Sequence, residues 1–461
     1  MSVPEPARSL TADECRALGK RILSFVEKGS TLVRIESAGD GGIRWGRNMV
    51  SAAHDSTNHR ITITRSVDGR RAEAVTNQLD DASLKDALAK ADQLIVVQGK
   101  GKPSTFLPPQ QYVAAELHSA ASAALSAADR SSIAYRSVVE PAIQAGNAAA
   151  GYLSATDKTT CLVNNSGLFS FFSETLAEYS TTVRNAAKNA SGWAGMSTWD
   201  WNKIDPAALG ARALHKCEAS ANPVAIEPGR YTAILEPQAV ADLMLLLVFT
   251  TNWDRAGAER GNSAWSGPAK ESTLLGQQVM DRRINVFSDP ADPDGGFRPF
   301  SLTGEPYERT VWIENGILKN LAYSRDYARQ KLKTDAQILA PDCFAFHMTG
   351  GESSVDEMVA SAERAVLVTR FTHLQLRDWK SATMSGSTRD GLWLVERGKI
   401  SKPIRNFRFT QSPLHVFNAV EMLGKPVRVF NPGSLFGLSL PFVVPPMRVR
   451  DFNFTSTVDS V

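Results

Sequence analysis

The spacing of hydrophobic and polar residues in the first half of the chain predicts helices interleaved with antiparallel hairpins. Residues 10–29 show helical spacing, with Thr11 or Asp13 as the capping residue. Residues 59–76 alternate between apolar and polar on both sides of Asp68-Gly69, a pair typical of a two-residue hairpin turn. Such a mixture predicts an α+β fold rather than a doubly wound parallel sheet.

Further segments complete the prediction for an N-terminal α/β domain, which we place at residues 1–224. Residues 31–48 are expected to form a strand, a turn and a second strand, and residues 80–95 an amphipathic helix. The Ala-rich residues 112–130 predict another helix, and residues 133–196 return to strands punctuated by small and turn-forming residues.

The C-terminal domain, residues 225–461, is predicted to be mainly antiparallel β-structure with a few helices. Residues 229–249 predict a strand followed by an apolar helix. Hairpins are expected on Asn315-Gly316 and Arg397-Gly398. A shift in the apolar phase of the last strand predicts a β-bulge near Arg450-Asp451.

Composition and charge fit an ordinary globular protein and argue against a nucleic-acid partner. The 461 residues exceed what a single small domain needs. The 51 basic and 48 acidic residues leave a net charge of +3, and the lysines and arginines are scattered along the sequence. Because nucleic-acid binding normally needs a basic patch, we expect no nucleic acid as partner.

Neither a membrane segment nor a disulfide framework is expected. The longest strongly apolar run, residues 243–249, is far shorter than the roughly 20 residues that cross a bilayer, and the N-terminus lacks a signal-peptide core. The four cysteines are widely separated and form no CxxC pair, which is usual for thiols in a reducing compartment. We therefore expect an unanchored cytoplasmic protein.

Two pairs of residues match parts of metal or nucleophile sites. His54 and His59 stand five apart beside a predicted hairpin, but no third ligand lies near them in the sequence, so we interpret them as surface-turn residues. Cys343 and His347 stand four apart, which on a strand would place both on one face. They are either half-buried strand residues or part of a zinc or nucleophile–base site, and both interpretations stay open.

A polar loop that contains Gly and Ser follows the apolar helix at residues 254–267. Its Arg255, Glu259, Arg260 and Asn262 are candidates for holding a peptide backbone or a carboxylate. A solvated, mobile connection is the alternative interpretation, although Trp265 would order one end of the loop.

The order of segments in the second half resembles the TldD/PmbA family, whose members have also been described as modulators of DNA gyrase. The segments are EPGRYTAILEP, RGNSAWSG, LLGQQVMDRRINVFSDP, GEPYERTVWIENGILKN and HMTGGESSVDEMVASAERAVLV, in that order within residues 225–460. The N-terminal layout of helix, hairpin and helix agrees. The resemblance implies a zinc-dependent peptidase built from a TldD and a TldE subunit, which acts on unfolded or extended peptides.

For the TldD subunit, the resemblance implies an HExxxH motif on the helix before the Ser-rich loop, whose histidines bind zinc and whose Glu is the general base. Aligning NSAWSG with that loop places the two His positions at Leu246 and Thr251 and the Glu position at Leu247. Leucine neither ligates zinc nor transfers a proton. The C-terminal cysteine that the family implies is also missing from residues 431–449. We therefore assign no catalytic or metal-binding residue to this chain.

The resulting hypothesis is a TldE-like subunit without catalytic residues of its own. It predicts no cofactor in this chain, zinc in a TldD-like partner subunit, and a peptide substrate in a cleft that the pair shapes together. The first alternative is a stand-alone homodimer that binds peptides or another protein without catalysis. The second is a divergent hydrolase that uses Cys343 and His347.

Overall fold

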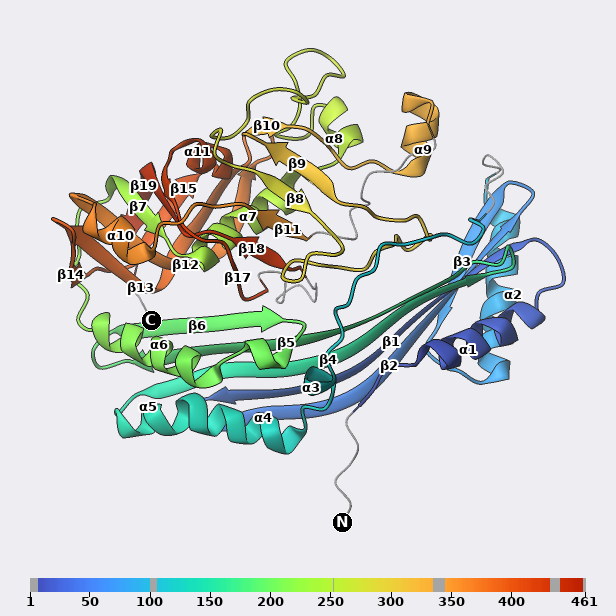
Figure 1. Ribbon diagram of the computed structural model, residues 1–461, viewed down its shortest axis with the longest axis horizontal. Coiled ribbons are helices and arrows are strands. Elements are labelled where there is room, and N and C mark those ends of the chain that lie inside the picture. Colours follow the sequence, from blue (N-terminus) through green and yellow to red (C-terminus); the bar gives the residue numbers. More distant parts are fainter. Residues whose placement is uncertain (1–6, 100–105, 252, 335–344, 432–439, 459–461) are drawn as a thin grey trace.

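The computed structural model describes residues 7–99, 106–251, 253–334, 345–431 and 440–458. They form the predicted α+β fold, with one antiparallel sheet and its helices in the N-terminal half and two further sheets in the C-terminal half (Figure 1). No helix among these residues is long and apolar enough to cross a membrane. The domain boundary at residue 224 remains a prediction.

The N-terminal sheet has six antiparallel strands in the order β3-β2-β1-β4-β5-β6. Successive residues of a strand point to opposite faces. As a result, one face carries the apolar residues, and the other carries polar and charged residues such as Arg34, Asp40 and Lys158. The strands are β1 (Ser30–Gly46), β2 (Met49–Val67), β3 (Arg70–Thr76), β4 (Ala148–Asn164), β5 (Phe169–Asn185) and β6 (Ala190–Thr198).

Helices cover the apolar face of this sheet from end to end (Figure 1). At one end, Ile22 and Leu84 pack against Ile35 and Ile63 of the sheet. Thr11 is the predicted N-cap of the first helix, in a capping box with Glu14. The helices are α1 (Ala12–Ser24), α2 (Asp81–Val97), α3 (Ala120–Ala123), α4 (Ala127–Ala134), η1 (Tyr135–Val139), α5 (Glu140–Gln144), η2 (Trp201–Lys203) and α6 (Pro206–Ala219).

The prediction of a strand, a turn and a second strand within residues 31–48 is wrong in the place of the turn, because β1 runs unbroken to Gly46 and the turn follows at Arg47-Asn48. The glycines that suggested a turn instead allow close packing. A Cβ atom on Gly39 would lie 2.1 Å from the backbone oxygen of Ala7, and one on Gly42 would lie 2.5 Å from the ring of His54. Glycine in a strand interior often marks such a close approach.

The prediction of one helix over residues 112–130 is also wrong. Leu117 instead forms a parallel bridge with Glu174, and its carbonyl accepts a hydrogen bond from Thr175. Ser119 and Ser126 then cap the short helices α3 and α4 separately. Serine favours caps over helix interiors, so these two residues divide a segment whose alanines suggested one helix.

The larger C-terminal sheet closes on itself. Strand β12 (Arg364–Asp378) pairs with β7 (Gly229–Leu235) on one side and with β13 (Thr383–Glu396) on the other. The strands β15 (Phe407–Gln411) and β19 (Met447–Thr457) complete the ring between β13 and β7. Phenylalanines fill the ring, among them Phe371, Phe409 and Phe452, whose centroids lie 4.6–5.6 Å apart.

A smaller sheet and short elements complete the domain. The sheet has the order β10-β9-β8-β11-β18-β17, with β8 (Val286–Ser288), β9 (Thr310–Glu314), β10 (Ile317–Leu318), β11 (Phe346–Met348), β17 (Val427–Arg428) and β18 (Phe442–Val444). The other elements are α7 (Pro237–Thr251), α8 (Arg255–Glu259), α9 (Arg325–Tyr327), η3 (Ala328–Leu332), α10 (Val355–Ala360), β14 (Lys399–Pro403), α11 (Pro413–Asn418) and β16 (Val420–Leu423).

The predicted turns and the predicted bulge are confirmed. All three hairpin pairs, Asp68-Gly69, Asn315-Gly316 and Arg397-Gly398, have positive φ at both residues, as a type I′ turn requires. The β7–β19 register shifts between Val449 and Phe452, and Asp451 has a φ of 57°. The bulge therefore lies where the apolar phase changes.

A half-buried arginine, Arg428, and its backbone partners link the two halves of the chain. Arg428 of β17 donates from Nε to the carbonyl of Ser197 on β6, at 2.6 Å, and from Nη1 to the carbonyl of Asp294. Burial lowers the pKa of Arg428 to about 10, so it stays charged at neutral pH. Trp199 adds a hydrogen bond to the carbonyl of Pro293 at 2.8 Å. The polar face of the N-terminal sheet is thereby held against the C-terminal half.

We predict that Gly39→Ala lowers the free energy of unfolding by about 1–3 kcal/mol, because the new methyl group would overlap the backbone of Ala7. Denaturant-induced unfolding measures the change. Gly46→Ala at the end of the same strand is the matched control, because nothing lies within 4 Å of its Cβ position. Equal stabilities for the two variants would contradict the close packing of the N-terminal segment on β1.

Candidate functional site

The apolar helix α7 contains the positions that the resemblance to the TldD/PmbA family assigns to two zinc ligands and a general base. Leu247 is fully buried in the main core of the C-terminal half, and Leu246 packs partly buried against the same core. The side chain of Thr251 lies outside the described part of the structure. Side chains of this kind leave no donor for a metal at positions 246 and 247.

Zinc does not fit elsewhere in the described chain either. Among the described residues, no three His, Cys, Asp or Glu side chains gather closely enough to hold a metal ion. Two histidines each lie beside a single carboxylate instead: His118 Nε2 lies 3.2 Å from Asp157, and His347 Nδ1 lies 2.6 Å from Asp292. No chemical step can therefore be derived through zinc on these residues.

The sequence interpretation of His54 and His59 as turn residues is wrong in its geometry, since both lie within strand β2. They point to opposite faces of the sheet. Nε2 of His54 lies 2.8 Å from Asp40, whereas Nδ1 of His59 lies 3.1 Å from Ser37. The structure does not bring the two imidazoles together.

Helix α7 also carries a carboxylate, Asp242, which precedes Leu246 and Leu247 in the sequence. Asp242 is buried, accepts a hydrogen bond from the backbone N–H of Phe371 at 2.8 Å, and accepts another from Gln238 Nε2 at 3.1 Å. Burial raises the pKa of Asp242 to about 6, against the two hydrogen bonds that lower it. Gln238 Oε1 is buried, and no described residue donates to it. A protonated Asp242 would donate to this oxygen only with the Gln238 amide turned over, because Nε2 faces the carboxyl group.

An aromatic wall separates the end of α7 from the loop that follows it. The ring of Trp253 lies 4.9 Å from Trp265, 5.6 Å from Trp312 and 5.5 Å from Phe346, measured between centroids. All four rings are buried. Trp265 therefore anchors the loop, as its place in the sequence suggested.

The four candidate substrate-binding residues differ in how free their side chains are. Arg255 Nε lies 3.3 Å from Glu259 on the next turn of α8, and Glu259 also accepts a hydrogen bond from the hydroxyl of Tyr327. Arg260 is 64% exposed and lies 3.8 Å from Asp254, and Asn262 is exposed. Arg260 and Asn262 are thus the two exposed candidates, and the one ion pair of Arg260 is a long contact with Asp254.

His347 is paired with an acid and not with a nucleophile in the described structure. It lies on β11, and its ring stacks on Phe287 with 4.7 Å between centroids. Burial acts to raise the pKa of Asp292, but hydrogen bonds from His347 and from the backbone hold that pKa below its usual value. Cys343 lies outside the described residues, so the proposed Cys343–His347 pair stays a prediction.

Comparison with known protein families and curated proteins finds relatives for the C-terminal half of the chain. Residues 228–456 match the family described as the PmbA/TldA metallopeptidase C-terminal domain. A metalloprotease TldD homolog of Buchnera aphidicola is 26% identical over 170 residues, which are 34% of this chain and 34% of that protein. A metalloprotease of Archaeoglobus fulgidus is 36% identical over 56 residues, 12% of this chain and 13% of that protein. The matches thus span about a third or less of these relatives' length.

Solved structures match almost the whole fold at low sequence identity. TldE from Thermococcus kodakarensis superposes with a TM-score of 0.79 at 14% identity, over 97% of this chain and 100% of that one. A proposed modulator of DNA gyrase from Thermotoga maritima gives 0.79 at 17%, over 95% and 100%. Another from Bacteroides thetaiotaomicron gives 0.77 at 16%, over 96% and 98%. Both halves therefore share their arrangement with these proteins.

We predict that Asp242→Asn stabilises the chain at pH 8 and has little effect near pH 4. The folded-state pKa of about 6 exceeds the ordinary value of 3.8, so the stability contributed by the bound proton is present at low pH and is lost as pH rises through 6. A shift of about two units corresponds to about 3 kcal/mol at most. An amide would mimic the protonated acid and could donate to Gln238.

The free energy of unfolding, measured from pH 4 to 8, tests this prediction. Asp68→Asn is the control, because Asp68 is an exposed residue in a type I′ turn that accepts either side chain. A pH-independent difference between Asp242→Asn and the unchanged chain would contradict the raised pKa.

Proposed function

The chain belongs, through its C-terminal domain, to the metallopeptidase-related PmbA/TldD family, and from this premise we propose that it is the non-catalytic, TldE-like subunit of a TldD–TldE-type zinc peptidase complex. The observation that carries the proposal is the apolar end of α7, where Leu246 and Leu247 occupy two of the ligand and base positions. A chain of this kind needs a zinc-bearing partner for hydrolysis.

The role of the subunit would be to bind and orient substrate rather than to cleave it. Two features support this role. The polar face of the N-terminal sheet carries charged and hydrogen-bonding groups, such as the ion pair between Lys158 and Glu174 at 3.7 Å. The ordered loop after α7 presents Arg260 and Asn262 to solvent. Groups of this kind suit the backbone and side chains of an extended peptide.

The proposed substrate is an unfolded or extended peptide. Such a peptide exposes unpaired backbone N–H and C=O groups, which polar side chains and sheet edges can satisfy. Within the candidate group, Arg260 and Asn262 would contact the peptide. Arg255 and Glu259 would hold the loop in place through their mutual contact and through Tyr327.

Reconstitution with a TldD-like, HExxxH-bearing relative from the same organism tests the proposal. We expect neither protein to cleave an unfolded peptide alone, and the mixture to cleave it and to elute with the mass of a mixed dimer. The partner with its motif Glu changed to Gln is the control for the source of catalysis. Its complex should assemble and remain inactive.

Two outcomes would overturn this function. Cleavage by the lone chain would favour the divergent hydrolase, for which His347→Ala would be the next variant. A homodimer that excludes the relative but binds the peptide would favour a stand-alone binding module.

A further inference from the structure

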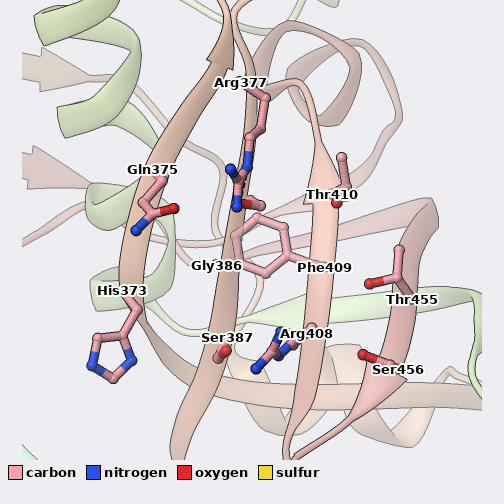
Figure 2. A pocket seen from close by; sticks show the side chains of 11 residues that line it. His373, Gln375, Arg377, Gly386, Ser387, Arg408, Phe409, Thr410, Thr455 and Ser456 are labelled. Carbon is pink, nitrogen blue, oxygen red and sulfur yellow. Dashed lines mark hydrogen bonds between the residues drawn. The ribbon is translucent and has the colours of Figure 1, made fainter.

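The outer face of the closed C-terminal sheet holds a polar hollow with a volume of about 470 Å³. It extends across four strands, β12, β13, β15 and β19, and Figure 2 shows side chains from all four around it. The volume falls within the roughly 300–1,000 Å³ typical of ligand pockets. The lining residues are His373, Gln375, Arg377, Ser385, Gly386, Ser387, Arg408, Phe409, Thr410, Thr455 and Ser456.

Irregularities in the two outer strands accompany this hollow. In β12 the register with β13 shifts between Thr372 and Gln375, and His373 there has a φ of 51°. In the β15–β19 pair the register shifts beside Arg408, so that Thr455 is left without a direct partner. A bulge bends its strand and increases the local twist, and bulges often lie beside functional sites. The irregular strands β12 and β19 thus lie on either side of the hollow, and β13 and β15 form its floor.

Two guanidinium groups approach the hollow from opposite ends (Figure 2). Arg377 folds over the floor and donates from Nε to Ser385 at 2.7 Å. Arg408 extends from β15 between its strand neighbours Ser387 and Ser456. Neither arginine forms an ion pair with another described residue, and none of the lining residues carries a carboxylate.

Further arginines continue the positive charge along the same face. Arg370 and Arg389 are cross-strand partners next to the hollow, and both approach the buried Asp390. Burial lowers the pKa of Arg389, and repulsion from Arg184 and Arg370 acts in the same direction. One carboxylate thus faces several guanidiniums, and the face keeps an excess of positive charge.

We propose that this arginine-lined hollow binds carboxylates of an acidic, extended polypeptide segment. Planar guanidiniums match carboxylates with two parallel hydrogen bonds, and the surrounding hydroxyls and the amide of Gln375 can bind peptide groups between them. Phe409 is fully buried in the core, so the exposed ring in the lining is the imidazole of His373. Single-stranded nucleic acids are normally held by several aromatic rings on which successive bases stack, so a lining with one such ring favours peptide.

Binding of a labelled peptide of alternating Glu and Ser to the full, unpartnered chain tests this site by fluorescence anisotropy. We expect saturable binding that weakens with added salt, and loss of binding when each Glu of the peptide is replaced by Gln. The double change Arg377→Gln and Arg408→Gln should raise the Kd by about tenfold or more. Arg136→Gln, an exposed arginine on η1 in the N-terminal half, is the matched control and should leave the Kd unchanged.

Three results would overturn the proposal: equal affinity of the double variant and the unchanged chain, equal binding of the Gln peptide, or tighter binding of single-stranded DNA than of the Glu peptide at the same salt. Competition by inorganic phosphate should be weak, because a single small anion cannot bind along the whole hollow. Since the assay uses the lone chain and no zinc partner, its failure would leave the subunit role in the peptidase complex intact.

Discussion

The enclosure of α7 on every side is the constraint on which the C-terminal half depends. Buried residues occur all round the helix, including Val240, Leu243, Met244 and Leu247. A helix that is apolar all round must be covered all round. The closed ring provides one cover through β7 and β12, and β18 with the aromatic wall of Trp253 and its neighbours provides another.

The same enclosure accounts for the apolar side chains at positions 246 and 247. Each fully buried leucine contributes about 1.5–3 kcal/mol to stability, whereas a charged Glu or an unliganded His at the same depth would cost free energy. The one exception, Asp242, is tolerated because it has two hydrogen-bond donors and a raised pKa that favours its neutral form. A helix built in this way stabilises the fold.

The sequence predicted well those features that are encoded within a few neighbouring residues. The three type I′ hairpins, the Thr11 cap and the bulge near Asp451 depend on local turn, capping and phase signals. The wrong predictions concern segments whose structure is decided by contacts with residues far away in the sequence. Whether Gly39 marks a turn or a close approach is decided by Ala7, and whether residue 117 is helical is decided by Glu174.

One of the two candidate sites can likewise be recognised from neighbouring residues in the sequence, and the other cannot. The apolar replacement of the family motif is visible in the sequence, because Leu246 and Leu247 are neighbours on one helix. The arginine-lined hollow is not, because Arg377 and Arg408 lie on different strands, β12 and β15, 31 positions apart in the sequence. Scattered in sequence, these arginines gave no basic patch, and only the paired strands bring them together.

The central claim is that this chain alone cannot hold catalytic zinc, and its zinc content tests that claim most directly. The purified chain would be incubated with excess zinc, passed through a desalting column and analysed by mass spectrometry for bound metal. Our account predicts far less than one zinc ion per chain. One tightly held zinc ion per chain would contradict it, and would show that residues outside the described segments, Cys343 among them, complete a metal site.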